Sequence, residues 1–188
     1  MATQTVESAP TAHRWTRAQY ERMVEAGVFG EDDRVELIEG EVIRMSPQGS
    51  RHATAIRLVQ QALQSVYSEG VLVDIQLPLA LGRDSEPEPD VAIVEGSPRD
   101  YIDAHPTTAV LVVEVSDASV DLDRTRKKWL YARHGIGTYW ILDLAHEHLE
   151  VYSDPEGTTY QTKRTFHRGD RVEAPRAEAT VAVADLLP

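Results

Sequence analysis

The sequence predicts an α/β domain in which helices flank a central mixed β-sheet. Two apolar runs, PDVAIV from Pro89 and AVLVVEVS from Ala109, have the length and branched composition of buried strands. A helical stretch at 121–134 then separates the second run from a third, TYWILDL, which begins at Thr138. A helix between two apolar strands implies a parallel crossover, and continuous apolar strands imply a sheet that is covered on both faces.

Composition indicates one water-soluble domain. The chain has 188 residues, of which 41% are hydrophobic and 27% charged, so it is long enough to bury a core. We expect a flexible tail over residues 1–12 and a single domain over residues 13–188. No apolar run is long enough to span a bilayer and no signal-peptide core is present, so no membrane partner is expected. The absence of cysteine excludes disulfides and thiolate metal sites and fits a cytoplasmic location.

The first elements are predicted to be a helix and a hairpin. Thr16 and Gln19 have the spacing of a capping box, which begins a helix, and Gly27 is a suitable end. The stretch RVELIEGEVIRM at 34–45 is typical of two short strands, with Gly40 near the bend.

A longer helix and a long strand are expected next. The helix follows a break at 47–50 and extends to about Glu69, where Gly70 ends it. Its apolar face comprises Ile56, Val59, Leu63 and Val66. Strict alternation then predicts one strand over 71–81. The face of that strand which points inward comprises Val71, Val73, Ile75, Leu77, Leu79 and Leu81.

Turn chemistry predicts the remaining connections. The segment GRDSEPEPD at 82–90 is rich in turn formers and acids, so we expect a loop. After TYWILDL, the runs HLEVYS and TYQTKRTF flank a DPEG turn, which predicts a further hairpin. The C-terminal part of the domain is therefore expected to be a β-rich extension of the sheet.

Two acids stand in otherwise apolar strands. Asp90 begins the first strand, and Glu114 lies near the end of the second. An ionised carboxylate in a buried strand is costly unless a cation or a donor compensates it. If the strands pair antiparallel, the start of one lies beside the end of the other and the two acids converge. Paired carboxylates bind hard cations such as Mg²⁺ or Mn²⁺, so the pattern indicates a metal site.

The helix that follows brings positive charge to these acids. From Asp121 to Gly135 it carries five Lys or Arg against two Asp, opposite to the balance of the whole chain. One face comprises Asp123, Lys127, Tyr131 and His134. An apolar face for the sheet comprises Leu122, Trp129 and Ala132. We expect Lys127 to project toward the carboxylates, where a depressed pKa would suit general-base chemistry.

Together these motifs resemble one known family. The runs PDVAIV, LVVEVSD and RKKWLYARHGIGTYWILD, with VELIEGEVIRMSP upstream and His52 shortly after it, are similar to the Uma-two family of restriction-endonuclease-like proteins. That family belongs to the PD-(D/E)xK nuclease superfamily. The similarity covers the chain from about Trp15 to Asp143 and more loosely beyond. It implies a restriction-endonuclease-like fold and a Mg²⁺-dependent phosphodiesterase site.

The resemblance assigns roles by position. Asp90 matches the aspartate of the superfamily and Glu114 the acid of its (D/E)xK element, so both would hold the metal, helped by the carbonyl of Val115. The chain departs from the pattern two residues after Glu114, where Ser116 stands in place of lysine. The lysine of this family is carried on the following helix, which indicates Lys127, with its neighbour Lys128 as the alternative.

A further acid or base is expected from the N-terminal half. The superfamily often adds an acid from its first helix. Here the candidates are His52 in the first turn of the long helix and Glu36 and Glu41 in the hairpin.

The overall charge leaves the activity open. The expected reaction is cleavage of a nucleic-acid phosphodiester, with DNA as the expected substrate. A formal net charge of −12 is unfavourable for gripping a phosphate backbone, so a local patch or bound metal would be required. Two alternatives remain, a catalytically silent binding or assembly module on the same scaffold and a phosphohydrolase of small nucleotides. Coordinated double-strand cuts would need two linked sites, so the sequence also leaves open a homodimer.

Overall fold

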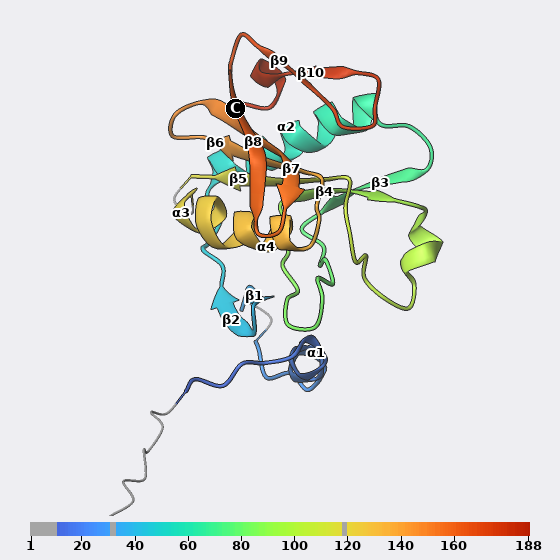
Figure 1. The fold of residues 1–188 in the computed structure, drawn as a ribbon, viewed down its shortest axis with the longest axis vertical. Helices are drawn as coiled ribbons and strands as arrows, with labels where there is room; N and C mark the ends of the chain where they lie inside the picture. Colours follow the sequence, from blue (N-terminus) through green and yellow to red (C-terminus); the bar gives the residue numbers. More distant parts are fainter. Residues whose placement is uncertain (1–10, 31–32, 118–119) are drawn as a thin grey trace, which may run out of the picture.

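The computed structural model describes residues 11–30, 33–117 and 120–188 (Figure 1). The predicted tail over 1–12 therefore lies outside the described residues, apart from the exposed Thr11 and Ala12. No helix of the described ranges is long and apolar enough to cross a lipid bilayer.

A mixed sheet forms the centre of the domain. Its six strands, counted over the described residues, are β3 (Val71–Ile75), β4 (Val91–Glu95), β5 (Leu111–Ser116), β6 (Thr138–Asp143), β7 (His148–Glu156) and β8 (Thr159–His167). They lie side by side in chain order. The pair β5–β6 is parallel, as the intervening helix predicted, and the other neighbours are antiparallel.

Helices and small hairpins cover both faces of this sheet. The helical elements are α1 (Arg17–Glu25), α2 (Ser50–Val66), η1 (Pro98–Tyr101), α3 (Val120–Leu122), the π-helical turn η2 (Asp123–Lys127), α4 (Lys128–Arg133) and η3 (Val183–Asp185). The hairpins are β1 (Val35–Ile38) with β2 (Glu41–Arg44), and β9 (Arg171–Glu173) with β10 (Thr180–Ala182). Figure 1 shows α2 and β9–β10 on one side of the sheet, with α3 and α4 on the other.

The alternation of strand residues produces two cores. In β4, Val91 and Ile93 pack into the cluster under α2, whereas Ala92 and Val94 pack into the cluster under α4. Both clusters consist of buried apolar side chains, so the sheet is covered on both faces, as predicted.

The N-terminal elements also match the prediction. The N–H of Gln19 donates to Oγ1 of Thr16 at 3.3 Å, and the N–H of Thr16 donates to Oε1 of Gln19 at 2.9 Å, which completes the capping box of α1. Gly27 follows the helix with φ of 67°, and Gly40 turns the β1–β2 hairpin with φ of 76°. Helix α2 ends at Val66, slightly earlier than expected.

The predicted strand over 71–81 is wrong in its second half. Strand β3 ends at Ile75, because Gln76 adopts the left-handed conformation with φ of 52°. Leu77 is consequently 51% exposed, and Leu79 and Leu81 are buried in the cluster under α4 and not in the one that β3 contacts. The alternation of apolar residues continues past the turn at Gln76, so the pattern did not show where the strand ends.

The predicted apolar face of the helix is right for Ala132, which is buried, but not for Leu122 and Trp129. The residues of η2 and α4 that are buried are Asp123, Lys127, Leu130, Tyr131 and Ala132. Leu122 and Trp129 are only half-buried. The polar face turns inward because the sheet presents the acid Glu114 at that point, which offers the buried polar groups a partner.

The segment 77–88 ties the N-terminal elements to the sheet. Glu86 forms an antiparallel bridge with Leu37 of β1, and the N–H of Gly40 donates to the carbonyl of Asp84 at 2.7 Å. The N–H of Arg17 donates to the carbonyl of Arg83 at 2.8 Å. Backbone hydrogen bonds therefore hold α1 and the β1–β2 hairpin against one loop.

Glu86 is buried within this junction at an electrostatic cost. Its Oε2 makes no hydrogen bond within the described part of the chain, and the Nε of Arg17 lies 3.8 Å away. Burial and the neighbouring Glu21 raise the pKa of Glu86 to about 7, although Arg17 opposes the shift. The folded state thus disfavours the ionised form of the Glu86 carboxyl near neutral pH.

We predict that Glu86→Gln stabilises the protein above neutral pH. A pKa raised from 4.5 to about 7 means that stability is fully present below pH 4.5 and is lost as the pH rises through 7. The amide removes that loss, so the free energy of unfolding should rise by up to about 3 kcal/mol at pH 8 and hardly change at pH 4. Urea unfolding at both pH values measures this. The matched control is Glu178→Gln at an exposed position, and an equal gain at pH 4 and pH 8 would contradict the explanation.

Candidate active site

A small pocket of about 120 Å³ lies where β4 begins and β5 ends. It opens between the β1–β2 hairpin, the segment 45–48, α2 and η2. Its charged and titratable lining residues are Arg34, Glu36, Arg44, His52, Glu88, Asp90, Glu114, Asp123 and Lys127. The antiparallel pairing of Val91 with Val113 is what brings the two strand acids to the same place.

Asp90 is held by donors from three different elements. Its Oδ2 accepts the N–H of Val115 at 2.8 Å, and its Oδ1 lies 3.3 Å from Nε2 of His52 and 3.2 Å from Nε2 of Gln76. Burial raises the pKa of Asp90, but His52, the Val115 N–H and Lys127 outweigh it and the net shift is downward. Asp90 is therefore an ionised carboxylate at neutral pH.

Glu114 is buried on the same face of the sheet as η2 and α4. Its Oε1 accepts hydrogen bonds from the Nζ of Lys127 at 3.1 Å and from the hydroxyl of Tyr131 at 2.8 Å. Both donors come from the helical segment that crosses over from β5 to β6. The cost of burying this acid is thus offset by a cation and a hydroxyl from a single element.

The residues that line the pocket include more acids than cations. Burial raises the pKa of Glu114 well above its usual range, and Asp123, Asp90 and Glu36 raise it further, while Lys127 lowers it. A buried excess of carboxylate is the environment that favours an additional positive charge.

Lys127 is protonated in this arrangement. Its Nζ lies 3.1 Å from Oε1 of Glu114 and 3.3 Å from Oε2 of Glu36. Burial lowers the pKa of Lys127, but the facing carboxylates outweigh it and raise the pKa above its ordinary value. The depressed pKa that we expected from the sequence is therefore wrong for this structure. Lys127 is a hydrogen-bond donor here and not a base.

The structure separates the two candidate lysines. Lys127 is buried and lines the pocket, whereas the half-buried Lys128 lies over the ring of Tyr152, with its Nζ 5.3 Å from the ring centroid. The two lysines are adjacent in sequence, but only Lys127 faces the acids of the pocket.

Ser116 fastens the lysine-bearing turn to the sheet. It occupies the position two residues after Glu114, and its hydroxyl makes a short hydrogen bond to Oδ2 of Asp123. Asp123 is the first residue of η2. The residue that replaces the expected lysine thus contacts the element that carries Lys127.

The N-terminal candidates occupy different places. His52 lines the pocket from the first turn of α2. Glu36 is buried in the pocket, where its Oε2 accepts the N–H of Glu88 at 3.3 Å. Glu41 does not line the pocket and makes ion pairs at 2.8 Å with Arg14 and with Arg126.

The sequence did not indicate Glu88, which lines the pocket, or Tyr131 and Gln76, which donate hydrogen bonds to its acids. Tyr131 was placed on the same helix face as Lys127 but given no role, although its spacing already contained the signal. Glu88 precedes Asp90 by two residues in an acid-rich loop, which was read only as a turn. Gln76 gave no signal, because apolar alternation placed it within a strand.

The donors present suit a hard divalent cation. Asp90 and Glu114 supply carboxylate oxygens, and the carbonyl of Val115 is directed to the same side of β5 as its N–H, which binds Asp90. In the described residues, no set of three or more His, Asp or Glu side chains is already gathered around one point. The buried acids exceed the cations and offer only oxygen atoms as ligands, which is the donor type that Mg²⁺ and Mn²⁺ prefer.

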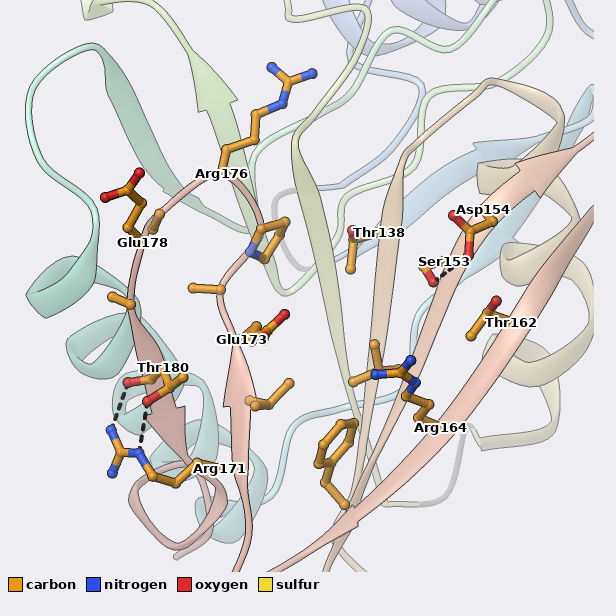
Figure 2. A pocket seen from close by; sticks show the side chains of 17 residues that line it. Thr138, Ser153, Asp154, Thr162, Arg164, Arg171, Glu173, Arg176, Glu178 and Thr180 are labelled. Carbon is orange, nitrogen blue, oxygen red and sulfur yellow. Dashed lines mark hydrogen bonds between the residues drawn. The ribbon is translucent and has the colours of Figure 1, made fainter.

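A larger groove lies elsewhere on the molecule. It has a volume of about 1120 Å³ and lies between the β6–β8 part of the sheet and residues 171–180 (Figure 2). Arg164, Arg171 and Arg176 alternate there with Asp154, Glu173 and Glu178, so neither sign of charge dominates. Because it lacks a cluster of convergent acids, we place the candidate chemistry in the smaller pocket.

Comparison with known proteins agrees with this architecture. The Uma2 family, described as "Putative restriction endonuclease", matches residues 17–184. The chain is similar in structure to a "putative nuclease belonging to DUF820" from Anabaena variabilis, with a TM-score of 0.71 and 18% identity over 91% of this chain and 96% of that one. This similarity confirms the predicted fold class. No curated protein matches the sequence. Since the family covers nearly the whole described domain, the chain belongs to the Uma2 family.

Proposed function

We propose that the protein is a Mg²⁺- or Mn²⁺-dependent endonuclease of the PD-(D/E)xK type that hydrolyses phosphodiester bonds, with DNA as its substrate. The observation that carries the proposal is the convergence of Asp90, Glu114 and Lys127 in one pocket at the meeting ends of β4 and β5. Membership in a family described as "Putative restriction endonuclease" supports the same chemistry.

Each residue has a task that follows from its environment. Asp90, Glu114 and the carbonyl of Val115 would hold the cation, which when bound makes water more acidic and stabilises charge on a phosphoryl oxygen. Lys127 would donate a hydrogen bond to a phosphate oxygen, because its ammonium is already directed into the pocket. His52 would take the proton from the attacking water, oriented by its contact with Asp90.

The remaining acids of the hairpin are assigned differently. Glu36 would share Lys127 with Glu114 and so help to fix the direction of the ammonium group. Glu41, paired with Arg126 of η2 and with Arg14, would hold the hairpin against the helix and not contact the substrate.

The size of the pocket favours a polymer over a free nucleotide. About 120 Å³ accommodates a phosphate group, whereas sites that enclose a whole small molecule measure about 300–1,000 Å³. Arg34 and Arg44 also line the pocket and add positive charge there, against the net charge of −12 of the whole chain. A nucleic-acid strand that presents one phosphodiester to the pocket fits its small volume and its two arginines.

We predict that Asp90→Asn abolishes metal-dependent cleavage. Loss of this ligand should reduce Mn²⁺-dependent nicking of plasmid DNA by at least about 100-fold and weaken Mn²⁺ binding in calorimetry. Asp154→Asn, at an exposed position in β7, is the matched control and should cleave normally. Cleavage by purified Asp90→Asn protein at the wild-type rate would remove this residue from the mechanism.

We predict that the two adjacent lysines respond differently to the same substitution. Lys127→Met removes the donor in the pocket and should lower the cleavage rate by about 100-fold. Lys128→Met alters only a contact with Tyr152 and should stay within a few-fold of wild type. Initial rates on supercoiled plasmid, with circular dichroism to verify folding, measure both. Equal loss in the two variants would show that general charge and not position matters.

The alternative functions give distinct outcomes in the same assays. Absence of both Mn²⁺ binding at millimolar concentration and cleavage would favour a non-catalytic module, since Asp90 and Glu114 already have protein donors. Hydrolysis of free nucleotides but not of oligonucleotides would favour a small-nucleotide phosphohydrolase.

A further inference from the structure

The same face of the sheet carries a second pair of buried acids next to the pocket. Register places Glu114, Ile141 and Glu150 in one row across β5, β6 and β7, and Ser116 with Asp143 in the adjacent row. Asp143 and Glu150 are both buried. The crossover segment therefore passes over one acid that binds Lys127 and two that do not.

Arg124 binds both of these acids. Its Nε and Nη2 donate to the two carboxylate oxygens of Glu150 at 3.1 and 2.8 Å, and Nη2 also donates to Oδ2 of Asp143 at 2.8 Å. Burial raises the pKa of Glu150, but the bonds from Arg124, Tyr152 and Lys163 bring it down to about 2. This is a bidentate, charge-assisted contact, which fixes orientation as well as distance.

The contact is made by the π-helical turn itself. Arg124 and Lys127 both belong to η2. Residues four positions apart lie on one face of a helix. Asp123 and Lys127, the two ends of this turn, are both buried and contact Ser116 and Glu114 of β5. Single π turns inside helices are rare and are frequently found at functional sites.

We infer that Arg124 is a positioning residue that fixes the π-helical turn so that Lys127 faces Glu114. This inference rests on the proposed function, because it assigns the task of Lys127 there. Arg124 does not line the pocket, and its guanidinium donates hydrogen bonds to Glu150 and Asp143. It acts through the backbone of η2, while the Ser116–Asp123 bond holds the first residue of the turn.

Cleavage kinetics test the inference through a double-mutant cycle. Arg124→Lys keeps the charge but loses the fork, and Arg124→Gln loses both. Each should lower kcat by about 10-fold or more with little change in KM, because the substrate does not contact this residue. In a Lys127→Met background the same substitutions should have no further effect. Arg99→Gln, at an exposed position in η1, is the control for loss of one positive charge. Additive losses would overturn the inference.

An assay without catalysis separates the inference from the proposed function. The lysines of the chain are Lys127, Lys128 and Lys163, and acylation of each by an amine-reactive reagent is measurable by mass spectrometry. Buried Lys127 should react slowest in the wild-type protein and at least about 10-fold faster in Arg124→Gln and Arg124→Lys. An unchanged rate in either folded variant would overturn the positioning role. Faster labelling in a protein that cleaves nothing would uphold it and reject the nuclease proposal.

Discussion

The compensation of one buried carboxylate determines how the domain is assembled. Glu114 lies in a strand whose other residues, apart from Ser116, are apolar, and its charge requires donors from the element that covers that face. The crossover from β5 to β6 meets this requirement by turning a polar stripe toward the sheet, with Lys127 and Tyr131 at its centre. The hairpin then completes the enclosure by placing Glu36 against the same ammonium.

The sequence was sufficient for the parts of the fold that depend on local periodicity. The apolar runs predicted β4, β5 and β6, and the helix between them predicted the parallel pair. The acids Asp90 and Glu114 stood out because charge in an apolar strand is unusual. Antiparallel pairing was then enough to place them in one pocket, and the spacing of Lys127 was enough to direct it there.

What the sequence could not provide depends on contacts between distant segments. Gln76 ends β3 in a left-handed conformation that non-glycine residues seldom adopt, and its side chain contacts Asp90, so tertiary structure overrides local propensity. The burial of Leu130, in place of Leu122 and Trp129, was not predicted, because helical spacing alone does not show which strand residues cover each position. The rise in the pKa of Lys127 depends on three carboxylates from other parts of the chain, those of Glu114, Glu36 and Asp90, and on Asp123 of its own turn.

The agreement between strand order and chain order has a consequence for how the molecule folds. From β3 to β8 each strand pairs with its immediate predecessor, so most contacts in the sheet close short loops. Asp90, Glu114 and Lys127 all belong to the β4–α4 part of this succession, and the pocket can form as soon as that unit collapses. The N-terminal hairpin and α1 make their contacts to loop 77–88 across a much longer separation. The acidic centre is thus expected to be an early folding product, and the elements that enclose it a late one.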